Sequence, residues 1–447
     1  MPPTPGEYSG QGLDDAPKSP LKGHKKVSSR GSRGSLRSPP KEIKKKENED
    51  TVVYEKLQNW NGGGHLTSVK PTADYEDALR LDEVERTRAP SGELVLKSGR
   101  IPSAGWEQSG IRFAPLNVPL KRRLQTAVVL GHTLSAFIFL SNFFFLAAIP
   151  LTWPLLFPYI IYILLSQSST NGRLSERSEW FRRQKFWSLF ASYFPARLHR
   201  TEELPPTRKY LFGYHPHGII SHGAFTAFAT EALGFNQLFP GITNSLLTLD
   251  SNFRVPFYRD YLLRLGLCSV SKESCTNILT KGGPNNEGMG RAITIVVGGA
   301  RESLEMKPGT LRLVLNCRKG FVKLAVETGA DLVPVLSFGE NDIYDQLDPS
   351  EHPTLHKFQL FFKKVFGFTT PVFHARGVFN YDVGIMPYRR PMNIVVGRAI
   401  KVEQQSTPDF DYVNKIHAQY VKELQLIWDT WKDDFARERT AELEIVE

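Results

Sequence analysis

The sequence predicts an α/β domain with flanking helices, preceded by a membrane-embedded helical hairpin and a disordered basic N-terminus. From Leu124 to Gly172 the chain has 49 residues without Asp, Glu, Lys or Arg. Beyond residue 186, short β-branched runs alternate with helix-like stretches, which is typical of an α/β sheet. Residues 17–46 hold eleven Lys or Arg and one Glu, which accounts for the whole net charge of +10. The expected parts are a tail and linker at 1–110, a hairpin at 111–172 and a cytosolic domain at 173–447.

The N-terminal part shows the composition of a disordered segment. Residues 1–50 are rich in Pro, Ser, Gly and Lys and have no apolar periodicity, so they cannot bury enough surface to offset the entropy of ordering. We interpret residues 51–110 as a weakly ordered linker. The basic stretch either attracts anionic lipid headgroups or stays a solvated tail, and the sequence leaves both open. Elsewhere, three cysteines in 447 residues exclude a disulfide scaffold.

The uncharged run suits a hairpin of two short membrane passes. Residues 124–149 are mostly apolar, Pro150 interrupts them, and residues 151–165 continue the run. A single span needs about 20 residues. Basic residues flank both ends, which places both ends in the cytoplasm. A long span followed by an in-plane segment and a buried soluble hairpin are the alternatives.

The downstream pattern predicts five strands and four helices. The expected strands are 209–214, 293–297, 312–315, 332–337 and 393–396. The expected helices are 223–233, 256–265, 320–328 and 409–436. Thr407-Pro408-Asp409 is a good helix start, and the apolar face of the last helix is assigned to core packing.

Three expected strands run directly into unusual polar residues, at His215–Gly218, Gly298–Glu302 and Phe338–Asn341. In α/β sheets, ligands bind outside the carboxyl ends of the strands. We therefore expect four catalytic candidates in one neighbourhood: His217, His215, Glu340 and Glu302.

The chemistry of these residue types suits general base catalysis. Imidazole titrates near neutral pH, and a nearby carboxylate can fix its tautomer. Glycines allow close backbone approach and expose N–H groups that stabilise an oxyanion, so Gly218, Gly298 and Gly299 are the expected donors. A capped turn at the histidines and surface positions for the two glutamates are the structural alternatives.

Other site chemistries are less well supported. His215 and His217 have the spacing of a metal pair, with His222 as a further ligand, but we expect no metal site and no cofactor. The sequence has neither a nucleophile elbow nor a phosphate-binding loop. A polyphosphate ligand such as coenzyme A needs cations. The candidates are Arg301, Arg318, Lys319, Arg389 and Arg390, for which solvation or membrane contact is the alternative.

The order of the motifs resembles the type-2 diacylglycerol acyltransferases, over roughly residues 110–440. The resemblance rests on Tyr193-Phe194-Pro195, His215-Pro216-His217-Gly218, Gly298-Gly299-x-x-Glu302, Arg318-Lys319-Gly320-Phe321, Leu332-Val333-Pro334-Val335, Phe338-Gly339-Glu340-Asn341 and Arg376-Gly377-Val378-Phe379. It implies a glycerolipid-acyltransferase-like sheet. It also implies transfer of a fatty acyl group from acyl-CoA to a neutral acylglycerol or a long alcohol at the endoplasmic reticulum, with the His-Pro-His-Gly block as the active site.

One departure from the related glycerolipid acyltransferases concerns the His-x4-Asp pair that they use. Counted from His217, the position of that Asp is His222, so the usual dyad is absent. If a carboxylate orients the histidine, Glu340 or Glu302 supplies it.

The expected function is formation of triacylglycerol from diacylglycerol and acyl-CoA, with His217 as general base and no covalent acyl-enzyme. Monoacylglycerol or a long-chain alcohol as acceptor, a non-catalytic lipid-droplet scaffold and a metal-dependent lipid hydrolase are the alternatives. The expected partners are acyl-CoA, diacylglycerol, the bilayer and the droplet surface, with no nucleic acid and with homo-oligomerisation left open. We expect the endoplasmic reticulum membrane as location, with lipid droplets second and the catalytic domain and both termini cytosolic.

Overall fold

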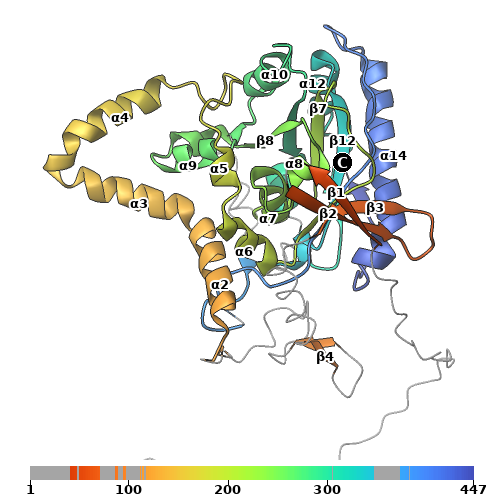
Figure 1. Ribbon diagram of the computed structural model, residues 1–447, viewed down its shortest axis with the longest axis horizontal. Coiled ribbons are helices and arrows are strands. Elements are labelled where there is room, and N and C mark those ends of the chain that lie inside the picture. The colour runs from red at the N-terminus through yellow and green to blue at the C-terminus, as the bar shows by residue number, and fades with distance from the viewer. Residues whose placement is uncertain are drawn as a thin grey trace, which may run out of the picture. The chain divides into compact units, whose positions relative to one another are not determined.

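The computed structural model describes residues 41–47, 50–70, 86–88, 94–96, 111, 113–114, 117–304, 306–346, 373–381 and 383–446. Within these residues, one sheet has ten strands in the order β1-β2-β3-β6-β15-β12-β7-β10-β8-β9 (Figure 1). The disordered tail was expected at 1–50, but residues 41–47 form β1 (Lys41–Glu47) and residue 50 begins β2 (Asp50–Gln58), so that part of the prediction is wrong. Residues 1–40 and 48–49 lie outside the described residues.

The centre of the sheet is parallel. It consists of β7 (Tyr210–His215) between β10 (Arg291–Val296) and β12 (Asp331–Phe338), and β8 (Thr243–Thr248) and β9 (Cys268–Ser269) extend it. All residues of β7 and β12 are buried, as expected for strands covered on both faces. The carboxyl ends of β7, β10 and β12 therefore meet at one edge of the sheet, which confirms the predicted α/β arrangement.

The other half of the sheet is mostly antiparallel. After β12 come β15 (Asn393–Val396), β6 (Arg197–Arg200), β3 (His65–Val69), β2 (Asp50–Gln58) and β1 (Lys41–Glu47). Residues 51–69 were expected in a weakly ordered linker, whereas the structure builds most of them into β2 and β3. Val52 and Tyr54 alternate inward, and Glu55 forms an ion pair with Arg197 of β6. These contacts attach the segment to the sheet.

The predicted helices are present with small shifts. The bounds of α12 (Gly320–Thr328) are as expected, whereas α9 (Tyr258–Arg264) and α14 (Phe410–Phe435) are slightly shorter. The start of α14 is capped by Asp409, whose carboxylate accepts the Tyr412 N–H at 2.9 Å. The helix expected at 223–233 is divided into α7 (His222–Ala224) and a π-helical turn, Phe225–Ala229.

Two apolar cores lie on the two faces of the sheet. Successive side chains of β7 point alternately into one core and the other. Leu211 packs with α12 and α14 on one face, and Phe212 packs with Phe228 and Phe235 on the other. One expected strand lies elsewhere: β11 (Arg312–Val314) pairs with β16 (Glu444–Val446) in a separate two-stranded sheet.

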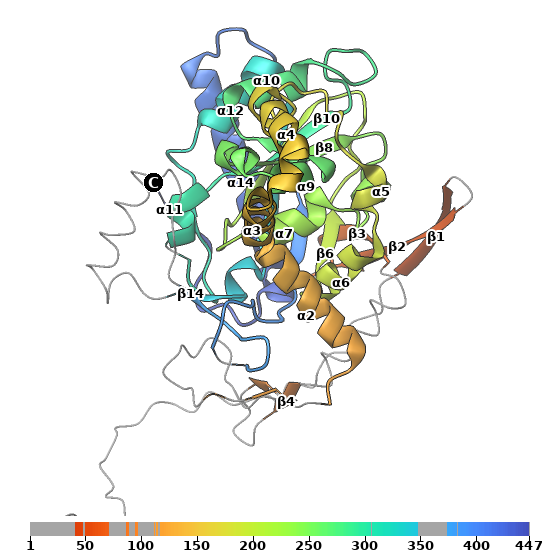
Figure 2. The same ribbon diagram turned by 90° about the vertical axis from the view of Figure 1, so that its left-hand side faces the viewer.

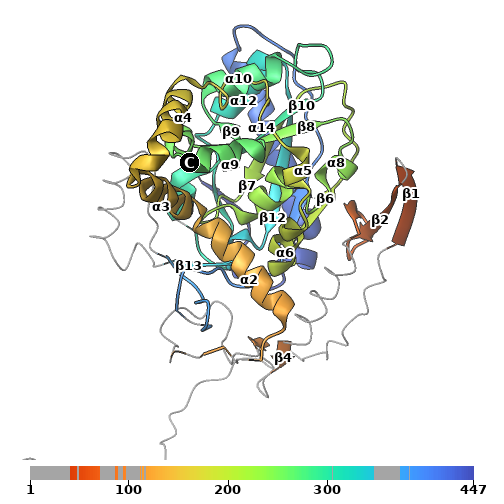
Figure 3. The ribbon, with the colours of Figure 1, turned by 60° about the vertical axis from the view of Figure 1, so that its left-hand side comes forward.

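The uncharged run lies in three helices, and the second and third of them form an arm that projects from the rest of the fold (Figures 1 and 3). They are α2 (Leu120–Thr133), α3 (Ser135–Ala147) and α4 (Trp153–Leu165), with a 3-10 turn at Pro150–Thr152 before α4. The turn lies where Pro150 predicted it. Among the described residues, no single helix has the length and apolarity to cross a membrane; α2 and α3 together meet that test on length and composition alone but are bent by 66°.

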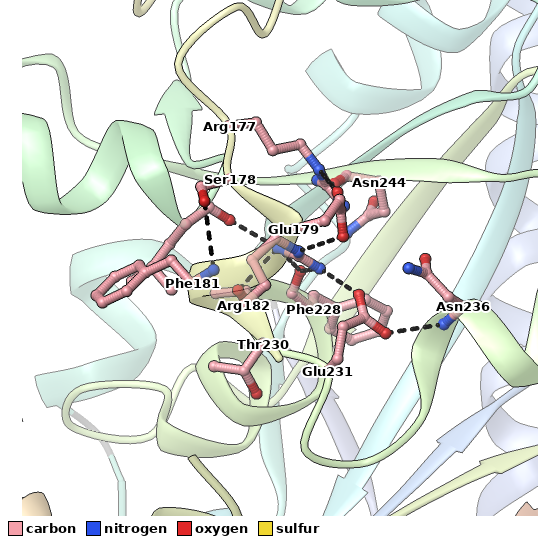
Figure 4. Close-up of polar contacts among 12 residues, drawn as sticks. Arg177, Ser178, Glu179, Phe181, Arg182, Phe228, Thr230, Glu231, Asn236 and Asn244 are labelled. Carbon is pink, nitrogen blue, oxygen red and sulfur yellow. Dashed lines mark hydrogen bonds and ion pairs between the residues drawn. The ribbon is translucent and has the colours of Figure 1, made fainter. Parts of the chain in front are cut away.

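Arg182 fixes the chain after the arm to the domain (Figure 4). It lies at the end of α5 (Glu179–Arg182) and is fully buried. Its guanidinium donates to the carbonyls of Ala229 at 2.7 Å and Leu265 at 2.6 Å, and to Glu231 Oε1 at 2.8 Å. Such a buried, multiply bonded arginine holds the base of the arm in one position.

Candidate active site

His217 has the geometry of a neutral base. It follows β7 and is half-buried. Its Nδ1 lies 3.0 Å from the Gly218 carbonyl oxygen. Because a carbonyl only accepts, Nδ1 carries the proton and Nε2 carries the lone pair. Burial lowers the pKa of His217, partly offset by this hydrogen bond, so the neutral form is favoured.

Glu302 holds the backbone of His217 rather than its ring. It lies on α11 (Gly299–Leu304), where its Oε1 accepts the His217 N–H at 2.5 Å and its Oε2 accepts the Val314 N–H at 3.0 Å. The carboxylate thus joins the loop after β7 to β11. A Cβ at residue 298 would lie 2.2 Å from Oε2, so the close approach depends on Gly298.

Glu340 lies beneath the loop that contains His217. It is fully buried, and its Oε2 accepts from the Tyr214 hydroxyl at 2.6 Å and the Gly223 N–H at 2.9 Å. A Cβ at Gly218 would lie 2.9 Å from Glu340 Cγ, so the two residues are in direct contact. Burial raises the pKa of Glu340 to about 7, although the hydrogen bonds oppose this. The hydrogen bonds described for Glu340 and Glu302 go to Tyr214 and to backbone N–H groups, and a carboxylate that orients the His217 ring stays a prediction.

His215 lies on the side of the motif that faces α14. It has no exposed surface, and its Nε2 is 2.9 Å from the Tyr420 hydroxyl, which also donates to the Gly213 carbonyl at 3.0 Å. Since Tyr420 has one hydroxyl proton, His215 Nε2–H is the donor in their pair. Burial lowers the pKa of His215 to about 3. The contact of His215 with Tyr420 ties the end of β7 to α14, and the direct catalytic role expected from the sequence stays a prediction.

His222, at the position of the missing Asp, contacts Tyr344. Its Nε2 is 2.9 Å from the Tyr344 hydroxyl, and the two rings stack. In the part of the chain that the structure describes, no group of three or more His, Cys, Asp or Glu side chains could hold a metal ion.

Comparisons with known proteins establish the family. Residues 144–446 match the family model described as Diacylglycerol acyltransferase. The chain belongs to the diacylglycerol acyltransferase family. This confirms the predicted family and the prediction that the protein is an acyltransferase enzyme.

Individual relatives of the family cover most of the chain. The chain is 50% identical over 341 residues to diacylglycerol O-acyltransferase 2A of Umbelopsis ramanniana, which covers 75% of this chain and 94% of that protein. It is 44% identical to diacylglycerol O-acyltransferase 1 of Schizosaccharomyces pombe, over 72% of this chain and 91% of the relative. It is also 43% identical to 2-acylglycerol O-acyltransferase 1 of Bos taurus, over 73% of this chain and 96% of that protein. A solved 1-acyl-sn-glycerophosphate acyltransferase, PlsC of Thermotoga maritima, matches at 12% identity and a TM-score of 0.30, over 65% of this chain and 97% of that one.

The five expected coenzyme A cations fall into two groups. Arg318 Nη2 lies 3.4 Å from the Gly298 carbonyl, and Lys319 Nζ lies 2.7 Å from Asn414 Oδ1. Arg301 is on α11, next to Glu302, so Arg301 and Arg318 lie near the end of β10, and Lys319 follows Arg318 in the chain and contacts α14. Arg389 instead binds α2, and Arg390 lies 3.7 Å from Glu438. The phenylalanine-rich segment 358–373 lies outside the described residues except for Phe373.

Sequence reasoning missed two tyrosines of the site. Tyr420 was assigned only to core packing, yet its hydroxyl supports His215, and Tyr214 supports Glu340. One pattern could have indicated Tyr420: Gly213 stands inside a strand, and a Cβ there would lie 2.0 Å from the Tyr420 hydroxyl. Glycine inside a strand often marks such a close approach.

Proposed function

We propose that this enzyme transfers a fatty acyl group from acyl-CoA to diacylglycerol at a membrane, forming triacylglycerol, with His217 as general base. The observation that supports the base is the hydrogen bond from Nδ1 to the Gly218 carbonyl, which leaves the lone pair on Nε2. Among the described residues, Nε2 has no hydrogen-bond partner, so it is available to a substrate hydroxyl. The names of the relatives support the substrate and the product.

The proposed step balances without a covalent acyl-enzyme. His217 Nε2 accepts the proton of the acceptor hydroxyl while the hydroxyl oxygen attacks the thioester carbonyl carbon. The tetrahedral oxyanion accepts hydrogen bonds from backbone N–H groups, with Gly218, Gly298 and Gly299 as candidates, and one such donor contributes about 3 kcal/mol. The C–S bond then breaks, and the coenzyme A thiolate takes the proton from the imidazolium.

Substrate positioning divides the remaining residues of the site. Arg301 and Arg318, near the end of β10, and the adjacent Lys319 are the proposed phosphate contacts of acyl-CoA. Arg389 and Arg390 contact other parts of the chain, α2 and Glu438, and a role for them in binding acyl-CoA stays a prediction. Glu302 and Glu340 act as positioning residues, through the backbone of His217 and through Gly218.

The α3–α4 hairpin is the proposed membrane anchor. Each helix has 13 residues, or about 20 Å, which is shorter than the bilayer core of about 30 Å, so the hairpin enters and returns on one side. Its apolar side chains are exposed, as for Leu151 at 88% and Leu155 at 78%. Basic residues on both flanks of the hairpin support cytosolic ends. We propose the endoplasmic reticulum as the membrane, with lipid droplets second.

A second acceptor has specific support. The similarity to 2-acylglycerol O-acyltransferases favours monoacylglycerol as the alternative, with the same chemistry and diacylglycerol as product. The same residues around His217 would act on either acceptor, so the choice between diacylglycerol and monoacylglycerol depends on the acceptor pocket.

The test uses membranes from cells that lack neutral-lipid synthesis, supplied with labelled oleoyl-CoA and diacylglycerol, monoacylglycerol or hexadecanol. We expect labelled triacylglycerol from the wild type, loss of product in His217→Ala, and normal product in the matched control His65→Ala, an exposed histidine of β3. Near-normal transfer by His217→Ala would remove the base assignment. Label in diacylglycerol or wax ester would change the acceptor.

A further inference from the structure

An exposed apolar surface continues from the α3–α4 hairpin along α2. The face of α2 opposite α6 (Lys185–Tyr193) has exposed apolar positions at three- and four-residue steps, which we call the α2 stripe: Leu120, Leu124, Ala127 and Gly131. The other face is buried, with Gln125 Nε2 donating to Ser192 Oγ at 2.9 Å. Beyond the stripe the exposed side chains of Phe137 and Ile138 begin α3. Exposed apolar positions therefore occur along both α2 and the start of α3.

Near the N-terminal end of the α2 stripe lies a hairpin loop, of which residues 375–381 and 383–386 are described. Bridges between Ala375 and Gly384 and between Arg376 and Met386 close this loop. The chain before α2 pairs with it, since the Ala114 N–H donates to the Phe379 carbonyl at 2.7 Å. Large exposed apolar side chains gather here, and we call them the apolar tip: Ile111, Phe113, Phe379, Val383 and Ile385. Phe379 and Phe113 are 77% and 76% exposed.

Arg389 joins the chain that follows the loop to α2. Its guanidinium donates to Gln125 Oε1 at 2.5 Å and to Thr126 Oγ1 at 3.2 Å, and it lies 4.2 Å from the centre of the Tyr193 ring. Figure 2 shows α2 beside α6, below the α3–α4 hairpin. The α2 stripe and the apolar tip are therefore held together as one surface.

This surface lies at the edge of the sheet that contains the candidate active site. After the carboxyl end of β12, β13 (Asp345–Gln346) pairs with β14 (Phe373–His374), which leads into the hairpin loop. The returning chain is bonded to the same segment, since the Tyr388 N–H donates to the Ile343 carbonyl at 2.8 Å. Glu340 lies between β12 and Ile343, so the apolar tip and the site extend from the same strand end.

We propose that the α2 stripe and the apolar tip form a second membrane-contact surface, which rests on the cytosolic leaflet of a phospholipid bilayer and holds the carboxyl edge of the sheet against it. Continuity with the hairpin supports a membrane rather than a protein partner. Charge supports it too, because segments 111–131 and 373–386 contain five Lys or Arg and one Asp, which suits anionic headgroups. An anchor alone would leave the domain free to tilt, whereas this contact gives the site a fixed orientation toward acceptors dissolved in the bilayer.

The test places a fluorophore at single cysteines of the full-length protein. Cys268 and Cys275 are buried and Cys317 is exposed, so Cys317→Ser is the background. Phe379→Cys reports the apolar tip, Phe145→Cys the hairpin, and Leu426→Cys is the matched control, an exposed apolar position on α14. Each bimane-labelled variant is placed in nanodiscs that hold one copy, made of phosphatidylcholine and phosphatidylserine with nitroxide-labelled acyl chains.

We expect the nitroxide chains to quench bimane at 379 and 145 at least about twofold, as for groups at the acyl boundary, and to leave bimane at 426 unchanged. Quenching at 145 without quenching at 379 would overturn the second surface and leave the hairpin in place. If bimane is quenched neither at 379 nor at 145, both the second membrane-contact surface and the membrane hairpin are wrong. If bimane at 379 is quenched in one-copy nanodiscs but not in vesicles with many copies, a second copy covers the apolar tip and the proposal is wrong. Val383→Cys replaces Phe379→Cys if that variant does not fold.

Discussion

Gly298 offers the sharpest test of how His217 is held. A methyl group there would lie 2.2 Å from the Glu302 carboxylate, far inside any allowed contact. The backbone at Gly298 does not have a left-handed φ, and the three heavy atoms nearest to the added methyl group all belong to Glu302. Gly298→Ala must therefore displace the carboxylate that accepts the N–H groups of His217 and Val314.

The expected magnitude follows from those two hydrogen bonds. A hydrogen bond to a charged group contributes about 1.5–3 kcal/mol. Since the displaced carboxylate keeps some contacts, we expect Gly298→Ala to lower the free energy of unfolding by about 2–4 kcal/mol. The loop that contains His217 loses its support, and small misplacements of catalytic groups are costly, so we expect kcat to fall at least about tenfold.

The assay combines acyl transfer in membranes with thermal unfolding in detergent. Gly320→Ala is the matched control, because no heavy atom lies within 4 Å of the added methyl group. A double-mutant cycle with Glu302→Ala isolates the cause: once the carboxylate is gone, Gly298→Ala should add little further loss. Equal behaviour of Gly298→Ala and Gly320→Ala would refute the positioning role of Glu302. Additive losses in the cycle would show that Gly298 acts by another route.

Two further predictions concern stability. Arg182→Leu leaves Glu231 and buried carbonyls unpaired, so we expect it to lower the free energy of unfolding by about 3–5 kcal/mol. The neighbouring exposed Arg183→Leu is the control and should change it very little. Equal effects of the two substitutions would show that the hydrogen bonds of Arg182 are not needed. Glu340 has a folded-state pKa of about 7 against an ordinary 4.5, so the stability gained by its protonated form is present below pH 4.5 and is lost as pH rises through 7. Each pH unit between these two pKa values corresponds to about 1.4 kcal/mol. Between pH 4.5 and 8, the free energy of unfolding of the wild type should therefore fall by about 3 kcal/mol relative to that of Glu340→Gln. A difference between the two proteins that does not change with pH would contradict a raised pKa of Glu340.

The fold was predictable where the sequence pattern is local. The bounds of α12 and β15 agree with the structure, because helical periodicity and short β-branched runs with clear ends define them. The strands β2 and β3 were not predicted, since their short alternation becomes a strand only through long-range pairing, such as Thr67 of β3 with Arg200 of β6. The same limit applies to the π-helical turn after α7, for which the sequence gives no breaking residue.

The candidate site was predictable as a neighbourhood but not as a set of bonds. Glycines and polar residues at three strand ends indicated that His217, Glu302 and Glu340 would meet, because parallel strands end at one edge. Which atoms pair depends on loop geometry, and Glu302 binds the backbone of His217 where a ring contact was expected. Arg389 illustrates the same limit: its charge suggested a phosphate ligand, but its side chain is directed to α2.

The tautomer of His217 suits the thioester chemistry proposed for it. A carboxylate partner would fix the tautomer and also stabilise the imidazolium, raising its pKa. The Gly218 carbonyl fixes the tautomer without a full negative charge, and burial keeps the pKa of His217 below its usual value of 6.5. A thiol has a pKa of about 8.5, so the imidazolium formed in the first step gives its proton to the departing coenzyme A thiolate downhill. A base held by a carbonyl is therefore sufficient for a thiolate leaving group, which explains how the site could do without the His–Asp pair.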